Sequence, residues 1–169
     1  MKVGDPFSAD DIDMGPLVEK RALESVEAKV AKAISQGAKV LVGGNRVGNK
    51  GYFFEATLLT NCRQDMDIIH EETFGPVLPI IPFDNIDQVI EWCNDCEYGL
   101  ASSVFTNDIN TASRMVRELE FGETYINRFH FEAIQGFHAG VKKSGIGGAD
   151  GKHGVEEYLR THVTYLQTR

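Results

Sequence analysis

Two adjacent glutamates open the segment 71–77, EETFGPV, and an aromatic residue, a glycine and a proline follow them. Proline fixes its own φ and lacks a backbone donor, while glycine permits backbone geometry closed to other residues, so the segment is predicted to be a shaped loop entering a strand. Loops of this kind commonly face a ligand. A glutamate carboxylate can accept two hydrogen bonds from the vicinal hydroxyls of a ribose. Two solvated glutamates before a strand are the alternative.

A second candidate is the loop 128–140, which mixes polar and aromatic side chains. It contains His130, Glu132 and His138 among Phe129, Phe131 and Phe137. Polar groups between aromatic rings suit a pocket for a small ligand. A surface loop anchored by phenylalanines explains the same residues, and the residue types alone do not decide between the two.

Motifs for metal and thiol chemistry are incomplete. Cys93 and Cys96 form a CxxC without a second pair or a nearby histidine at zinc-site spacing. They close a predicted helix, where the dipole opposes a thiolate, so Cys93 is expected to be a small core hydrophobe. His70 and Glu71 begin like the HExxH zinc motif, but Phe74 stands where the second histidine belongs. The sequence therefore predicts no metal site and no redox CxxC in this chain.

Helical and strand patterns alternate along the chain. Helices are predicted over 16–36, where Leu23, Val26, Val30 and Ile34 share a face, from 86 to 93 after the capping candidates Asp84 and Asn85, and over 108–119 and 151–160. Strands are predicted over 38–42, 52–59, 77–83, 100–106, 123–127 and 161–167, with a long loop over 128–150. Such alternation predicts an α/β layered fold with a mostly parallel sheet and flanking helices. The terminal strand has no later partner in the chain and needs a neighbour.

Charge and hydropathy narrow the class of protein. The chain has 169 residues and a net charge of −8, which disfavours nucleic acid and acidic membranes as partners. No apolar run approaches the roughly 20 residues of a membrane-spanning helix, and the first residues lack the pattern of a signal peptide. Three cysteines at irregular spacing indicate reduced thiols. The expected location is the cytoplasm.

Several motifs in a fixed order resemble the C-terminal part of NAD(P)-dependent aldehyde dehydrogenases. They are Asp13-Met14-Gly15-Pro16-Leu17, Gly43-Gly44, EETFGPV at 71–77, Tyr98-Gly99-Leu100-Ala101, GETYIN at 122–127 and Lys143-Ser144-Gly145. The resemblance implies that Glu72 holds the nicotinamide ribose of NAD or NADP and that Phe74 packs beside the nicotinamide.

Among aldehyde dehydrogenases, the chain is most similar to those that act on lactaldehyde and glycolaldehyde. The similarity rests on GETYINR at 122–128, FEA at 131–133 and QGFHAG at 135–140. It implies that Glu132 and His138 bind the hydroxyl of a small hydroxyaldehyde where other members have apolar or aromatic residues. A site built to bind a hydroxyl rejects analogues that lack it.

The resemblance also implies what the chain lacks. The family's nucleophilic cysteine, general-base glutamate and Rossmann half have no counterpart here, so the isolated chain is expected to be inactive. We expect residues 1–160 to be a partial catalytic domain and 161–169 to be an oligomerisation strand that joins copies of the chain through 161–167. A separate N-terminal half is a further expected partner. The alternative is a non-catalytic oligomerisation or interaction module left from a degenerate or split dehydrogenase gene.

Overall fold

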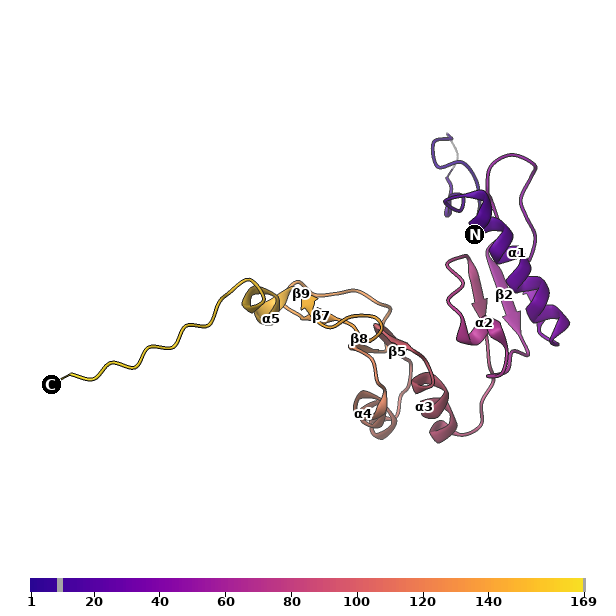
Figure 1. The fold of residues 1–169 in the computed structure, drawn as a ribbon. Coiled ribbons are helices and arrows are strands. Elements are labelled where there is room, and N and C mark those ends of the chain that lie inside the picture. The colour runs from indigo at the N-terminus through magenta and orange to yellow at the C-terminus, as the bar shows by residue number, and fades with distance from the viewer. Residues whose placement is uncertain (9–10, 169) are drawn as a thin grey trace. The chain divides into compact units, whose positions relative to one another are not determined.

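The computed structural model describes residues 1–8 and 11–168. The chain divides into two compact units, Met1–Asp84 and Asn85–Arg169, which are described separately (Figure 1). Both units combine helices with short strands, which confirms the prediction of an α/β protein. Within the described residues, no helix has the length and apolar character needed to cross a membrane.

The first unit is a long helix packed against a three-stranded sheet (Figure 1). Its elements are α1 (Lys20–Ser35), β1 (Lys39–Val42), β2 (Thr57–Thr60), α2 (Asp67–His70) and β3 (Val77–Pro79). Strand β2 lies in the centre, antiparallel to β1 and parallel to β3. The parallel pair brings the residues just before β3 to the start of β2.

Helix α1 buries one face, as its spacing predicted, with one exception. Leu23, Val26 and Val30 are at most 2% exposed and pack around Phe54. The prediction for Ile34 is wrong, because that side chain is 47% exposed and Ala33 is buried instead. The buried stripe therefore continues from Val30 by a step of three residues, which is the other spacing that keeps side chains on one helix face.

A backbone hydrogen bond lies at each end of α1. The helix begins at Lys20, four residues later than predicted, and the preceding Leu17 donates its N–H to the carbonyl of Tyr52 at 2.9 Å. At the other end Gly37 has a φ of +107°, and Ala38 donates its N–H to the carbonyl of Ala33 at 3.0 Å. A glycine with positive φ is a common helix stop because it has no Cβ to clash.

The second unit contains three helices and six short strands in the described part of the chain. In order they are α3 (Ile86–Asn94), β4 (Tyr98–Gly99), β5 (Ala101–Val104), α4 (Ile109–Glu118), β6 (Glu123–Ile126), β7 (His138–Ala139), β8 (Val141–Lys142), β9 (Gly148–Ala149) and α5 (Gly151–Glu156). Strands β5 and β6 are parallel, whereas β4 pairs with β8 and β7 with β9 in antiparallel fashion. Since the pairings in both units are of both kinds, a single layered and mostly parallel sheet stays a prediction.

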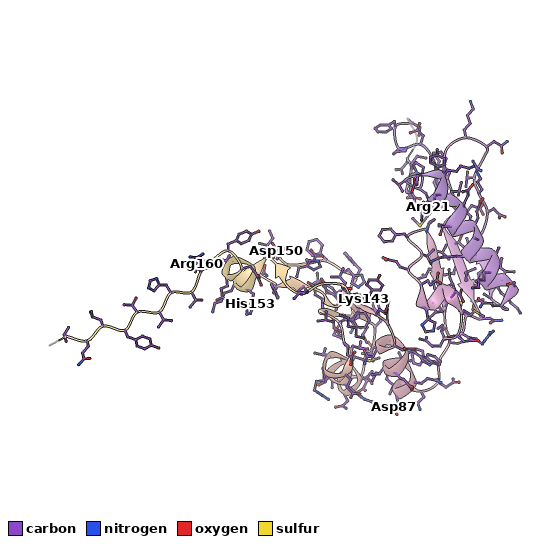
Figure 2. The ribbon with its side chains drawn as sticks, in the orientation of Figure 1. Arg21, Asp87, Lys143, Asp150, His153 and Arg160 are labelled. Atoms are coloured by element: carbon purple, nitrogen blue, oxygen red, sulfur yellow. The ribbon has the colours of Figure 1, made fainter. Side chains whose placement is uncertain are left out.

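Side-chain caps and an ion pair organise the two longer helices of this unit. Asn85 accepts a hydrogen bond from the backbone N–H of Asp87 at the start of α3, which confirms the predicted cap. Asp108 plays the same role at the start of α4. The guanidinium of Arg114 on α4 pairs with the carboxylate of Asp87, which is labelled on α3 in Figure 2. This ion pair helps to tie the two helices together.

One prediction at the C-terminal end is wrong, and another stays a prediction. The segment 128–150 is not one long loop, because β7, β8 and β9 interrupt it with backbone pairs. No strand is assigned over the described residues 161–168, where the chain runs extended beyond Arg160 (Figure 2). A strand is defined by its hydrogen-bonded neighbour, so the predicted pairing of 161–167 with another copy stays a prediction.

Candidate functional site

The loop 71–77 holds its aromatic residue in an unusual backbone conformation. Phe74 has a φ of +46°, a region that bulky residues rarely adopt, and its side chain is 83% exposed. Such a residue costs on the order of 1–3 kcal/mol and persists only where the surroundings fix it. The strained backbone therefore directs an apolar ring toward solvent, where a ligand could cover it.

Gly75 has a different role from the one predicted. The sequence suggested that this glycine adopts a backbone geometry closed to other residues, but the positive φ belongs to Phe74 instead. A Cβ built on Gly75 would lie 2.5 Å from Cγ2 of Val26, a fully buried residue of α1. The glycine is therefore needed for close packing of the loop against α1.

A lysine of α1 holds the same loop by its backbone. Lys29 donates from Nζ to the carbonyl oxygen of Glu72 at 2.6 Å and lies 3.3 Å from Oε2 of Glu71. On the other side of the loop, Thr57 of β2 donates its N–H to the carbonyl of Pro76 at 2.8 Å. The loop is thus fixed at two points, and the side chain of Glu72 remains exposed. Sequence reasoning missed Lys29, although its place directly before the buried Val30 put it at the edge of the packed face of α1.

The exposed carboxylate of Glu72 and ring of Phe74 fit the predicted contact with a nicotinamide nucleotide. A carboxylate on a rigid loop can accept the two ribose hydroxyls, and an exposed ring beside it can cover an apolar face of the ligand. The roles of the two residues stay predictions, because only their placement is observed.

Glu132 and His138, the predicted substrate residues, lie together in the second unit. Nδ1 of His138 is 3.5 Å from Oε1 of Glu132 and 2.9 Å from Oε1 of Glu123. The side chain of Glu132 is 51% exposed, whereas that of Glu123 is only 15% exposed. His138 therefore stands between an inner and an outer carboxylate.

Glu123 also binds a tyrosine on its own strand. Because alternate residues of a strand share a face, Tyr125 stands beside it and donates from its hydroxyl to Oε2 of Glu123 at 2.6 Å. The guanidinium of Arg128 lies 5.7 Å from the centre of the Tyr125 ring, and His130 makes an edge contact with that ring. Sequence reasoning singled out neither Glu123 nor Tyr125, although their spacing of two on a predicted strand was a usable signal.

Hydrogen bonding within this cluster shifts three pKa values. The bond to Glu123 raises the pKa of His138 above its ordinary value against the effect of burial, and the charge of Glu132 adds to the rise. Burial of Glu123 opposes its ionisation, but the bonds from Tyr125 and His138 prevail, so the pKa of that carboxyl is lowered. The hydrogen bond between Tyr125 and Glu123 also raises the pKa of Tyr125 to about 12. The cluster thus favours an ionised Glu123 next to a protonated His138.

Possible ligand atoms of Glu123, Glu132 and His138 lie within 4.8 Å of one another. The hydrogen bond between His138 and Glu123 and the charge pair between His138 and Glu132 account for their proximity without an ion. The prediction of no metal site remains a prediction.

The cysteines show no activating surroundings in the described part of the chain. Cys62 is 2% exposed, and its burial raises the pKa of the thiol. Burial likewise raises the pKa of Cys93, which lies in the last turn of α3 as predicted. Cys96 is exposed, and all three are free thiols. Raised pKa values are the opposite of what a thiolate nucleophile needs.

Comparisons with known proteins give a consistent result. The model of the aldehyde dehydrogenase family matches residues 1–164. Lactaldehyde dehydrogenase of Escherichia coli (strain K12) is 56% identical over 168 residues, which cover 99% of this chain and 35% of that protein. The 3,6-anhydro-alpha-L-galactose dehydrogenase of Vibrio sp. (strain EJY3) is 49% identical over 98% of this chain and 35% of its own length.

Solved structures agree with the sequence matches. A structure of lactaldehyde dehydrogenase superposes with a TM-score of 0.94 at 56% identity, over 99% of this chain and 35% of the other. A structure of 3,6-anhydro-L-galactose dehydrogenase in complex with NAP superposes with a TM-score of 0.88 at 51% identity, over 94% and 34%. The chain thus spans about a third of the length of the relatives it matches.

Proposed function

Because this chain belongs to the aldehyde dehydrogenase family, we propose that it is the C-terminal part of an NAD- or NADP-dependent enzyme that oxidises small hydroxyaldehydes to carboxylic acids. Lactaldehyde and glycolaldehyde are the substrates we propose. The observation that carries the proposal is the His138–Glu132 pair, with a distance of 3.5 Å between Nδ1 and Oε1. Together the pair offers a donor and an acceptor to a substrate hydroxyl.

Glu72 and Phe74 are the residues proposed to hold the cofactor. Lys29 fixes the backbone of Glu72, which leaves the carboxylate exposed for the ribose hydroxyls. The nicotinamide ring, when bound, supplies the acceptor for the hydride that leaves the substrate. The contribution of this chain is to orient that ring through its ribose and to limit its movement with the side chain of Phe74.

The isolated chain is proposed to be inactive. Chemistry of this family needs a thiolate, and burial raises the pKa of Cys62 and Cys93. Neither glutamate of the loop 71–77 is assigned as the general base, since Glu71 is paired with Lys29 and Glu72 is proposed to bind ribose. On this proposal a further part of the enzyme supplies the nucleophile and the base.

Exposed apolar surface supports such a further part. Leu41 and Val42 of β1 and Leu78 of β3 are each about 60% exposed on the small sheet of the first unit. Exposed apolar patches of this kind commonly mark an interface. We propose that in the complete enzyme the small sheets join larger α/β layers, which would restore the mostly parallel arrangement.

A second candidate function is a non-catalytic oligomerisation module. It is favoured by the extended C-terminal segment, where Val163, Tyr165 and Leu166 are between 64% and 94% exposed. In both proposals, residues 161–167 add a strand to a neighbouring copy. Light scattering on the full chain and on a form that ends at Leu159 tests this shared role, since loss of the segment should lower the mass. An unchanged mass would remove support for the segment as an oligomerisation strand.

A fusion protein tests the proposed activity. The part of Escherichia coli lactaldehyde dehydrogenase that precedes the matched region is joined to this chain, and the fusion is assayed with lactaldehyde and with propionaldehyde, which lacks the hydroxyl. We expect NAD- or NADP-dependent oxidation that favours lactaldehyde, and loss of about 10-fold or more of that preference in His138→Phe. Glu91→Gln, a change of charge on the exposed face of α3, is the control. A correctly assembled fusion without preference for lactaldehyde would refute the substrate class, and turnover by the chain alone would refute its inactivity.

A further inference from the structure

The carboxylate of Glu123 is shared between two partners, one on each oxygen. Oε2 accepts from the hydroxyl of Tyr125 at 2.6 Å, and Oε1 lies 2.9 Å from Nδ1 of His138. With both oxygens engaged and only 15% of the side chain exposed, Glu123 has little freedom to rotate. It forms the fixed end of the cluster.

The backbone beneath Glu123 is also fixed. Strand β6 pairs in parallel with β5, where Glu123 lies opposite Ala101 and donates its N–H to the carbonyl of Leu100 at 3.0 Å. The preceding Gly122 allows β7 to pass very close, because a Cβ there would lie 1.6 Å from the carbonyl oxygen of Ala139. This close approach places His138 beside Glu123.

His138 is held from its other side by β9, since it lies opposite Ala149 in the antiparallel pair. The backbone of His138 is therefore fixed, and its ring makes one hydrogen bond, through Nδ1 to Glu123. Within the described residues, the structure shows no hydrogen bond to Nε2. This nitrogen is the ring atom left to meet a ligand.

The two carboxylates near His138 differ in what they can do. Glu123 is the closer and the more buried one, whereas Glu132 is half exposed and its Oε1 lies 3.5 Å from Nδ1. A buried carboxylate behind a histidine fixes which ring nitrogen carries the proton and how the ring is oriented. An exposed one remains free to contact a substrate.

We propose that Glu123 is a positioning residue for recognition of the substrate hydroxyl: it holds His138 through Nδ1–H so that Nε2 points to the ligand, as an acceptor while the ring is neutral and as a donor when the ring is protonated. This inference rests on the proposed function for the identity of the ligand. The orientation of the ring does not depend on that function, and the two are tested separately.

Nitrogen-15 NMR of the histidine side chains in the full chain tests the orientation. We expect neutral His138 to carry its proton on Nδ1 and to titrate at a higher pH than in Glu123→Gln. Glu132 and Asp150 are the other acidic groups whose charge acts on the ring, so Glu132→Gln should move the titration less than Glu123→Gln. An unchanged tautomer and titration in Glu123→Gln would overturn the proposal.

Further variants separate positioning from loss of structure. Tyr125→Phe removes the partner of Oε2 and should retain the proton on Nδ1. If Glu123→Gln does not fold, Glu123→Asp keeps the charge but withdraws it by one methylene, and we expect an intermediate shift of the titration. Backbone amide spectra monitor folding in every case, and Glu91→Gln should leave His138 unchanged.

Kinetics of the fusion protein complete the test. Glu123→Gln should lower kcat/KM about tenfold for lactaldehyde and less than twofold for propionaldehyde. Equal losses for the two aldehydes would overturn the role in hydroxyl recognition. If the unchanged fusion shows no preference for lactaldehyde, the proposed function fails, and the NMR result still decides whether Glu123 positions His138.

Discussion

The ammonium group of Lys29 lies 2.6 Å from the backbone oxygen of Glu72, 43 residues further along the chain. The contact joins α1 to the loop that carries both proposed cofactor residues. Because Lys29 donates to the backbone carbonyl of Glu72, the carboxylate of Glu72 remains available for a ligand. Helix α1 therefore serves as more than a cover for the sheet, because it sets the position of the loop 71–77.

Replacing Lys29 with methionine should loosen this loop while keeping the apolar stem of the side chain. Loss of one charge-assisted hydrogen bond costs about 1–2 kcal/mol, which predicts roughly tenfold faster hydrogen exchange where the loop is bonded to the sheet. The reporting amide is that of Thr57, which donates to the carbonyl of Pro76. Lys20→Met, which removes an exposed pair with Glu24 on the same helix, is the control and should not change this exchange. Equal exchange in all three proteins would show that Lys29 does not hold the loop.

Gly75→Ala should destabilise the first unit because the new methyl group would meet Val26 at 2.5 Å. Overpacking of a buried contact costs about 1–3 kcal/mol. Because the conflict is with one side chain, Val26→Ala should relieve it, so the double variant should be more stable than the sum of the two single effects predicts. The coupling is measured by urea unfolding of the unchanged chain, the two single variants and the double variant. Hydrogen exchange of amides in the first unit monitors the unfolding. Additive effects would mean that Gly75 is required for a reason other than Val26.

The sequence predicted the elements well where local chemistry decides them. The caps Gly37 and Asn85 and the buried stripe through Val26 and Val30 are confirmed because capping and helical spacing act within a few residues. Prediction failed where a segment distant in the sequence determines which residue a position can hold. The need for a glycine at 75 comes from α1.

The candidate site shows the same limit. Glu132 and His138 were singled out by resemblance, and the structure brings them together. Glu123 was missed, because its contact with His138, 15 positions further along the chain, requires β6 and β7 to meet, and no local pattern signals that meeting. Helix α4 is a further case, since its apolar residue Ile109 is 77% exposed. Periodicity identifies an apolar face but does not say what covers it.

Asp108 should make the stability of α4 dependent on pH. Hydrogen bonds from the hydroxyl and N–H of Thr111 and from the N–H of Asn110 lower the pKa of this carboxyl below its ordinary value of 3.8. A group with a lowered folded pKa stabilises the protein above its unfolded pKa and loses that effect as the pH falls through the folded value. The Tm of Asp108→Ala should therefore lie below that of the unchanged chain at pH 7, and the gap should narrow as the pH falls below about 4.

A neutral cap supplies the matched control for Asp108. Asn85 accepts from the N–H of Asp87 at the start of α3 but has no carboxyl to protonate. The difference in Tm between Asn85→Ala and the unchanged chain should therefore stay nearly constant over the same pH range. A gap for Asp108→Ala that also stays constant would contradict the assigned role of its ionised form.

The order in which the cysteines react with a thiol reagent tests whether this chain contains a nucleophile. Cys96 is exposed and should be labelled first, whereas Cys93 is partly buried with a raised pKa and should react more slowly. Cys62 is 2% exposed, so its labelling should require opening of the first unit and should accelerate in urea. Mass spectrometry after timed labelling at pH 7 gives the three rates. Rapid labelling of Cys62 in the native chain would contradict its assignment as a core residue and would reopen the search for a reactive thiol within this chain.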